Sequence, residues 1–362
     1  MRLFLCLLLA CAGPVLLSAQ TIRSFSIGNS LTAGMEGDSL HDDLVAGTGN
    51  TWFSRSHTVP GAPLNFHWHD YLGDVRSKAG LPGGNWDALI LQPFGRPLYE
   101  NRTPGSPRYP QGDAWNALNF AREFRSSNPG VLAYVYQTFA DTPENASGGV
   151  DFAAFDYKTA WDTAYTDVFS GTNSRTRDYF GQVVEEMRDP QEALRSNLAL
   201  DPPPADPGTL MIPFGDVLYE INERMRLGNF GAFGDVEEWY RDPVHLKFGL
   251  PQYVKAATFY ATLFGESPDG LEWTVYDDPQ NFSRIRGGTI EEIDGIPYFQ
   301  SFGATVEEKE AMAALVNDAV WDVVAGHPYS GVAAIPEPST AAMLAAAVAA
   351  AVAVAARRHR SG

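Results

Sequence analysis

The chain has 362 residues, of which 44% are hydrophobic, enough for one large domain or two small ones. Its formal net charge is −18 at pH 7, and so acidic a surface repels phosphate backbones, which argues against nucleic acid as a partner. Both cysteines, Cys6 and Cys11, lie near the N-terminus, so the body is expected to contain neither disulfides nor thiolate metal sites.

Residues 1–19 have the pattern of a secretory signal peptide. Arg2 is followed by the apolar run Leu3–Leu9, and Leu17-Ser18-Ala19 precedes an expected cleavage after Ala19. Cleavage before Cys11, as in a lipoprotein, is the alternative. In either case the sequence predicts an exported protein.

Residues 20–265 alternate between short apolar runs and amphipathic stretches, which is the pattern of a layered α/β domain. A short or irregular helix is expected from Leu31, because Gly34 and Gly37 interrupt the segment. The remaining patterns predict strands at 23–28, 51–59, 86–92, 131–139 and 209–214, and helices at 64–78, 113–126, 216–226 and 254–264. The strongly apolar run at 86–92 is typical of a strand in a parallel sheet. We therefore predict a three-layer α/β/α sandwich with a mostly parallel sheet of roughly five strands.

Two stretches depart from this alternation. Residues 141–207 form an irregular insertion that ends in a proline-rich connector at 201–207. Long irregular loops often line a substrate cleft, and a decorative insertion is the alternative. Residues 266–330 form an appendage with a helical pattern at 306–324, which is expected to pack back on the domain.

One serine and one histidine have the surroundings that a nucleophile and its base need. Ser30 follows the apolar strand at 23–28, and His245 stands three residues after Asp242. A serine hydroxyl attacks effectively only when an imidazole takes its proton, and a carboxylate orients that imidazole. A capping aspartate with an incidental histidine is the alternative reading of the second motif.

This order of Ser30, Asp242 and His245 resembles the SGNH/GDSL hydrolase superfamily. In that superfamily the nucleophile ends the first strand, and a D-x-x-H turn precedes the last helix of the domain. The resemblance implies a flavodoxin-like sandwich, a serine nucleophile and no cofactor. The third block of the family usually has an asparagine, whereas this chain has Gln92 after Leu91, as in the divergent Leu-Gln branch.

The literal Gly-Asp-Ser-Leu motif of the family would select Ser39 instead. In open α/β folds, however, ligands bind at the carboxyl ends of the strands, where helix N-termini also face the site. Ser30 follows a strand, whereas the residues before Ser39 cannot form one. We therefore predict Ser30 as the nucleophile.

An oxyanion hole requires N–H donors directed at the developing negative charge. The backbone N–H of Ser30 is the first candidate. By resemblance to the family, Gly61 supplies a second N–H and the side-chain amide of Gln92 takes the place of asparagine. Gly28 and Asn29 are expected to support the nucleophile loop.

No metal site is predicted. His67 and His69 lie two residues apart on a predicted helix, so they point in different directions, and no third ligand is evident. Both are expected at the surface or in a cleft. The many aromatic residues are expected mainly in the core, and sugar stacking is the alternative.

The C-terminal residues 331–362 resemble a PEP-CTERM sorting signal. Pro336-Glu337-Pro338 precedes the apolar run Ala341–Ala356, within a short transmembrane segment at 339–356, and a basic cluster follows. Such tails imply processing by an exosortase during export to the surface of a Gram-negative bacterium. A permanent single-span anchor is the alternative.

Together these patterns predict an exported serine esterase that acts on esters, including acyl groups on polysaccharide. The alternative is an inactive SGNH-fold surface protein that binds polysaccharide or has a role in the extracellular matrix.

Overall fold

A computed structural model describes residues 19–33, 38–98, 112–144, 146, 149–166, 175–190, 204–281, 292–293 and 296–332. The predicted signal peptide up to residue 18 and the sorting tail from residue 333 lie outside the described residues. No helix in the described ranges is long and apolar enough to cross a membrane.

The centre of the protein is a five-stranded sheet with the strand order β2-β1-β3-β4-β5. Its strands are β1 (Thr21–Gly28), β2 (Thr51–Thr58), β3 (Ala88–Leu91), β4 (Leu132–Tyr136) and β5 (Leu210–Ile212). Every neighbouring pair is parallel, so all five carboxyl ends lie along one edge. The strand order reverses between β1 and β3, where open α/β sheets form their ligand crevice.

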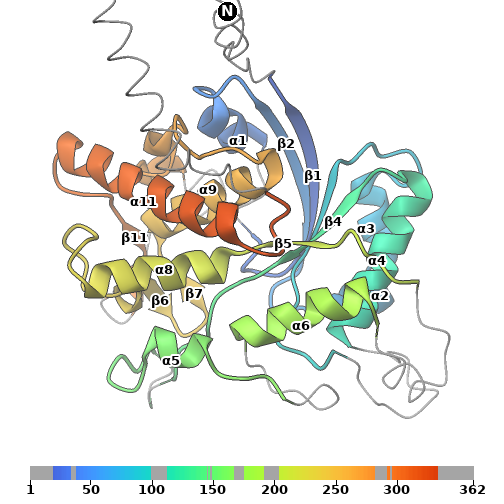
Figure 1. The fold of residues 1–362 in the computed structure, drawn as a ribbon, viewed down its shortest axis with the longest axis horizontal. Helices are drawn as coiled ribbons and strands as arrows, with labels where there is room; N and C mark the ends of the chain where they lie inside the picture. Colours follow the sequence, from blue (N-terminus) through green and yellow to red (C-terminus); the bar gives the residue numbers. More distant parts are fainter. Residues whose placement is uncertain are drawn as a thin grey trace, which may run out of the picture.

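Helices cover both faces of the sheet, which confirms the predicted three-layer α/β/α sandwich (Figure 1). One layer consists of α2 (Leu64–Asp70), α3 (Leu72–Ala79), α4 (Asp113–Ser127) and α6 (Arg177–Arg188). The other consists of α1 (Asp38–Val45), α8 (Phe214–Arg226), α9 (Leu250–Phe264) and α11 (Val306–Gly326). Helix α11 packs outside α8 and α9 rather than on the sheet itself.

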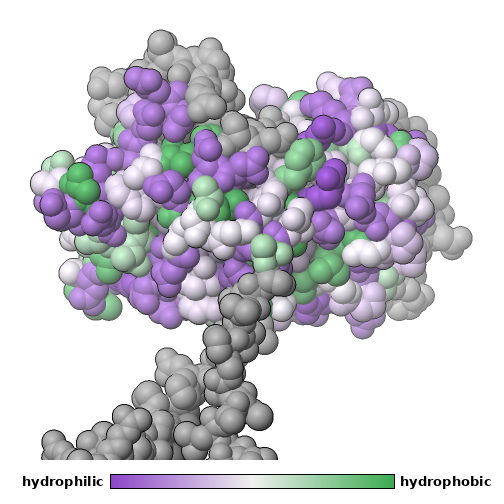
Figure 2. Space-filling view, turned by 90° about the horizontal axis from the view of Figure 1, so that it is seen from above, coloured by the Kyte–Doolittle hydropathy of each residue, from purple (hydrophilic) through white to green (hydrophobic). Residues whose placement is uncertain are grey.

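The central strands are apolar because both of their faces are covered. All four residues of β3 are buried, and Phe25 and Ile27 of β1 are fully buried. Phe25 contacts the rings of Trp86 and Phe124, so aromatic residues fill the space between sheet and helices. On the face seen in Figure 2, polar residues predominate and apolar residues form small separate groups.

The predicted helix at 64–78 is two helices, α2 and α3, with a break at Tyr71. There the backbone has φ −127° and ψ 13°, outside the helical region. The Tyr71 ring packs on His57 of β2 and on Phe66. The tertiary contacts of this ring therefore accompany a kink that the apolar spacing does not reveal.

Among its described residues, the insertion at 141–207 contains two helices that were not predicted from the sequence, α5 (Tyr157–Trp161) and α6. In α6 the buried residues Tyr179, Val183 and Met187 recur every four positions, so one face of the helix packs on the domain. The insertion is thus partly regular and covers one face of the sheet beside α4.

The C-terminal appendage packs on the domain through a helix and a strand. Its predicted helix is confirmed as α11, which begins with a capping box between Thr305 and Glu308. Strand β11 (Phe299–Gln300) pairs with β8 (Phe248–Gly249), which directly precedes α9. The remaining short elements are β9 (Glu292–Ile293), β10 (Ile296–Pro297) and the 3₁₀ helices η1 (Val236–Trp239) and η2 (Trp273–Val275).

The segment after α11 lies beside β5, which is an edge strand of the sheet. The Met211 N–H of β5 donates to the carbonyl of Tyr329 at 2.8 Å. His327 also lies 3.3 Å from the carboxylate of Asp216, and Gly331 contacts Leu210. These contacts keep the last described residues on the edge of the sheet.

Candidate active site

The D-x-x-H motif forms a tight turn between two short antiparallel strands, β6 (Tyr240–Asp242) and β7 (His245–Leu246). The Asp242 carboxylate accepts hydrogen bonds from the N–H groups of Val244 at 3.0 Å and His245 at 2.8 Å. Aspartate favours such a turn because its side chain can bond the backbone two residues ahead. The turn thereby holds the carboxylate next to the imidazole of His245.

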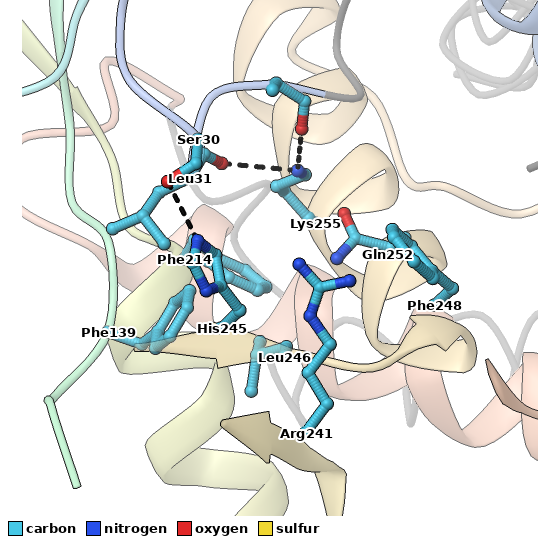
Figure 3. Close-up of a pocket in the computed structure, with 11 residues that line it drawn as sticks. Ser30, Leu31, Phe139, Phe214, Arg241, His245, Leu246, Phe248, Gln252 and Lys255 are labelled. Atoms are coloured by element: carbon cyan, nitrogen blue, oxygen red, sulfur yellow. Dashed lines mark hydrogen bonds between the residues drawn. The ribbon is translucent and has the colours of Figure 1, made fainter. Parts of the chain in front are cut away.

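The imidazole of His245 bridges Asp242 and Ser30, and its contact with Ser30 is drawn in Figure 3. Its Nδ1 lies 2.8 and 2.9 Å from the two carboxylate oxygens of Asp242, and its Nε2 lies 2.8 Å from the Oγ of Ser30. A carboxylate can only accept, so Nδ1 carries the proton and Nε2 is left to accept the proton of Ser30. The three predicted residues are therefore brought together in the arrangement that activates a hydroxyl.

The environment of Asp242 keeps it ionised. Burial opposes ionisation, but the hydrogen bonds from His245 and Val244 outweigh it and lower the pKa of this carboxyl below its usual value. Arg241 adds to the effect, with its Nε 3.5 Å from the carboxylate. A negative charge is thus available to orient the imidazole.

The loop that carries Ser30 is organised by Asn29, which is fully buried. The side-chain Oδ1 of Asn29 accepts from the N–H of Leu31 at 3.0 Å. Its carbonyl accepts from the N–H groups of Thr32 and Ala33, each at 3.0 Å. The chain therefore turns sharply after β1, and Ser30 lies at the turn with its hydroxyl directed at His245.

Gln92 supports this loop from the neighbouring strand β3. Its Nε2 donates to Asn29 Oδ1 at 2.9 Å, and its Oε1 accepts from the N–H of Asn29 and the hydroxyl of Thr32. The nitrogen and the oxygen of the Gln92 amide, which was expected at the oxyanion, thus both form hydrogen bonds with Asn29. Gln92 does not line the pocket beside Ser30. A Cβ at Gly28 would overlap the side chains of Thr32 and Gln92, so glycine permits this close approach.

Gly61 lies in the exposed turn that follows β2. It has φ +67°, a left-handed conformation that favours glycine. The turn is linked to the nucleophile loop, because Asn29 Nδ2 donates to the carbonyl of Ala62 at 3.4 Å. Gly61 is not among the residues that line the pocket beside Ser30.

A small pocket opens beside Ser30 and His245 (Figure 3). One wall is apolar and includes Phe139 and Phe214, and the other carries Arg241 and Lys255. In the figure the guanidinium of Arg241 lies between His245 and Gln252, both drawn as sticks. The pocket therefore combines an apolar wall with two cationic side chains close to the serine.

Lys255 is a site residue that sequence reasoning missed. It is 4% exposed, and its Nζ donates to the carbonyls of Leu31 and Ala33, each at 3.4 Å. It holds the residues that directly follow Ser30. The sequence does mark this residue, because Lys255 is the single charged residue within the apolar helix α9.

The alternative serine, Ser39, lies in helix α1 rather than at the end of a sheet strand. The carboxyl end of β1, which is next to the D-x-x-H turn, carries Ser30 instead. In the ranges that the structure describes, the hydrogen bond to His245 is made by Ser30.

The expectation that His67 lies at the surface or in a cleft is wrong. His67 is fully buried, and its Nδ1 lies 2.9 Å from Nδ1 of His57 on β2. Burial, followed by the neighbouring His57, lowers the pKa of His67 to about 3. His69 is half-buried. The described residues contain no group of three or more side chains that could hold a metal ion.

No protein-family model and no curated protein matches the chain. Similar solved structures include a DUF4886 family protein from Bacteroides uniformis, with 14% identity, a TM-score of 0.43, and coverage of 84% of this chain and 95% of that one. A candidate SGNH hydrolase from Slackia heliotrinireducens has 16% identity and a TM-score of 0.36, over 66% and 96% of the two chains. A candidate GDSL-like lipase from Parabacteroides merdae has 12% identity and a TM-score of 0.36, with coverage of 68% of this chain and 97% of that one.

Proposed function

We propose that the protein is a serine esterase of the SGNH type. His245 takes the proton of Ser30 while Asp242 orients the imidazole, and Ser30 attacks the carbonyl carbon of an ester. The leaving alcohol departs with a proton from His245, and water then hydrolyses the acyl-enzyme by the same steps. The observation that carries the proposal is the 2.8 Å contact between Ser30 Oγ and His245 Nε2.

The oxyanion would be held by the backbone N–H groups of Ser30 and Gly61. Gly61 is proposed for this role by resemblance to the family, and its turn is attached to the nucleophile loop through Asn29. Gln92 contributes by fixing Asn29, so we assign it a positioning role in place of direct contact with the oxyanion.

Small acyl esters are the proposed substrate class. Phe139 and Phe214 form the apolar wall beside Ser30 against which a small acyl group could pack. Acetyl groups on polysaccharide are the proposed substrates, on the basis of the family resemblance and the export signal at residues 1–19. Export to the cell surface and processing of the tail by an exosortase remain proposals that rest on residues 1–19 and 331–362. Mass spectrometry of the mature termini would test them.

Turnover of p-nitrophenyl acetate by the purified protein tests the proposed reaction. Ser30→Ala should lower kcat/KM by about 10³-fold or more, because it removes the nucleophile. Ser39→Ala serves as the matched control and should retain activity. A fluorophosphonate probe should label Ser30, as located by mass spectrometry.

The opposite pattern, with activity lost in Ser39→Ala and kept in Ser30→Ala, would show that the nucleophile is misassigned. Absence of both turnover and labelling would contradict the esterase proposal itself. Retention of the protein on immobilised polysaccharide would then favour the inactive, polysaccharide-binding alternative.

A further inference from the structure

Lys255 is a buried cation on the helix that follows the D-x-x-H turn. Every position of α9 except Gln252 is buried, and Lys255 is the single charged residue of this helix. An ammonium that leaves water needs polar partners to replace its hydration. The position of Lys255 therefore calls for a physical reason.

The partners of Lys255 are carbonyl groups of the loop that carries Ser30. Its Nζ lies 3.4 Å from the carbonyl oxygens of both Leu31 and Ala33, and Figure 3 shows the side chain directed from α9 at this loop. Lys255 also lines the pocket beside Ser30. Because the side chain is almost fully buried, its charge is weakly screened and polarises the carbonyl groups that it contacts.

The loop after β1 connects the polarised carbonyl of Leu31 to the N–H of Ser30 through two peptide groups. The carbonyl of Leu31 belongs to the same peptide group as the N–H of Thr32, which donates to the carbonyl of Asn29 at 3.0 Å. The carbonyl of Asn29 in turn shares a peptide group with the N–H of Ser30. Hydrogen bonds in such a chain strengthen one another, because each polarised peptide group becomes a better donor.

This chain of hydrogen bonds is oriented towards the proposed oxyanion. The ammonium of Lys255 is at its carbonyl end, and the N–H of Ser30, a proposed donor to the oxyanion, is at the other end. A positive charge at the carbonyl end of aligned peptide groups is the favourable arrangement with their dipoles. The N–H of Ala33 also donates to the carbonyl of Asn29 at 3.0 Å, so two donors polarise this carbonyl.

We propose that Lys255 is a positioning residue that strengthens the N–H of Ser30 as an oxyanion donor, through the two peptide groups that lie between them. Its charge stabilises the transition state, in which the oxyanion carries negative charge, more than the bound ester. In its kinetic consequences this inference rests on the proposed esterase function, whereas the effect of the charge on the peptide groups does not.

Lys255→Met tests this role, because the methionine side chain fills a similar space without a charge. We expect kcat for p-nitrophenyl acetate to fall about tenfold, less than the loss of about 10²–10³-fold for a deleted oxyanion donor, while KM changes by less than about threefold. The matched control is Lys247→Met, which removes a second buried lysine that does not line the pocket. This control should keep both constants.

Returning the charge separates its effect from that of packing. Lys255→Ala leaves room for propylammonium, which has the atoms that the substitution removes beyond Cβ, and added propylammonium should raise kcat severalfold. It should not raise kcat of Lys255→Met, whose side chain fills the space. Where these variants fail to fold, Lys255→Arg and Lys255→Gln replace them. The charged arginine should give a kcat about tenfold higher than glutamine, and equal values would overturn the inference.

The amide proton of Thr32 provides a measurement that does not depend on turnover. Amide protons resonate further downfield in stronger hydrogen bonds, so the NMR signal of Thr32 should move upfield in Lys255→Met as the bond to the carbonyl of Asn29 weakens. The same signal should stay in place in Lys247→Met.

An unchanged kcat and an unchanged Thr32 signal in Lys255→Met would overturn the inference. A fall in kcat that propylammonium does not reverse, with the Thr32 signal in place, would show that the lysine only fills space and would overturn it equally. A signal that moves without any change of kcat in the active protein would refute the effect on the oxyanion. A protein without esterase turnover whose Thr32 signal moves as expected would refute the proposed function alone.

Discussion

A single buried glutamine holds the nucleophile loop in place. Gln92, which directly follows β3, forms hydrogen bonds with both the backbone N–H and the side chain of Asn29. It also accepts a hydrogen bond from the hydroxyl of Thr32. Asn29 in turn fixes the backbone that follows Ser30, because it accepts hydrogen bonds from the N–H groups of residues 31–33. The amide of Gln92 therefore acts on the position of Ser30 through Asn29 and Thr32.

Gln92→Leu should lower both stability and activity. The substitution leaves the N–H of Asn29 and the hydroxyl of Thr32 buried without their partner, at a cost of about 1–3 kcal/mol in the free energy of unfolding. Urea unfolding measures this cost, and kcat/KM should fall because Ser30 loses its fixed position. Gln280→Leu, at an exposed position away from the pocket, is the control and should change stability by no more than about 0.5 kcal/mol. An unchanged kcat/KM in Gln92→Leu would refute the positioning role.

The site residues that could be predicted are those with a local signal. Ser30 follows an apolar strand, and Asp242 and His245 lie within one turn, so short-range spacing identifies them. Gln92 and Lys255 could not be assigned their roles in this way. Their partners, Asn29 and Leu31, lie far away in sequence and meet them only in the folded domain.

At the level of elements, all five predicted sheet strands are confirmed. The central strand β3 is a continuous apolar run because both of its faces are covered, whereas buried and more exposed positions are interspersed along the edge strand β2. Helices were harder to delimit. The insertion helix α6 combines aromatic with charged residues, which obscures its buried face in the sequence. The break at Tyr71 accompanies a ring contact with His57 of β2, and local periodicity does not encode such a tertiary contact.

Helix α1 and strand β2 share a buried histidine that should make stability depend on pH. His41 stacks on Trp52 with ring centres 4.1 Å apart, and its Nδ1 lies 2.7 Å from the hydroxyl of Ser54. Burial, followed by the charge of Lys255, lowers the pKa of His41 from 6.5 to about 3. The folded protein therefore keeps this ring neutral where the unfolded chain would protonate it.

Stability should fall as the pH drops below about 6.5, since the unfolded state then binds the extra proton. At pH 5 the contribution of His41 amounts to about 2 kcal/mol lost relative to pH 7.5. His41→Gln should flatten the dependence of the unfolding free energy on pH by about this amount, whereas the control His69→Gln should not. Denaturant unfolding at several pH values provides the comparison, and equal slopes in His41→Gln and the wild type would contradict the expectation.

At the scale of the whole molecule, the candidate active site depends on segments from most of the chain. The nucleophile comes from β1 and its support from β3, while the catalytic turn is held by the loop after β4. The appendage also reaches this region, because the guanidinium of Arg241 lies 4.6 Å from the ring centre of Phe248 and 4.9 Å from that of Tyr298. The body up to Val332 is therefore best regarded as one functional unit.

Shortening the chain within its last described segment should change how the protein associates. A protein that ends at Val332 retains the contacts with β5, whereas one that ends at Gly326 loses the hydrogen bond between Met211 and Tyr329 and the contact between His327 and Asp216. We expect the shorter protein to form dimers and larger species, measured by size-exclusion chromatography with light scattering. Identical behaviour of the two proteins would contradict this expectation.

We therefore expect the segment at 327–331 to prevent the edge strand β5 from pairing with a second copy of the chain. An exposed edge strand has unpaired N–H and carbonyl groups that can form hydrogen bonds with another chain, and natural proteins commonly cover such edges. Here the cover comes from the residues that connect the folded body to its C-terminal tail. If that tail is cut during maturation, a cut beyond Val332 would release a protein that already carries its own protection against aggregation.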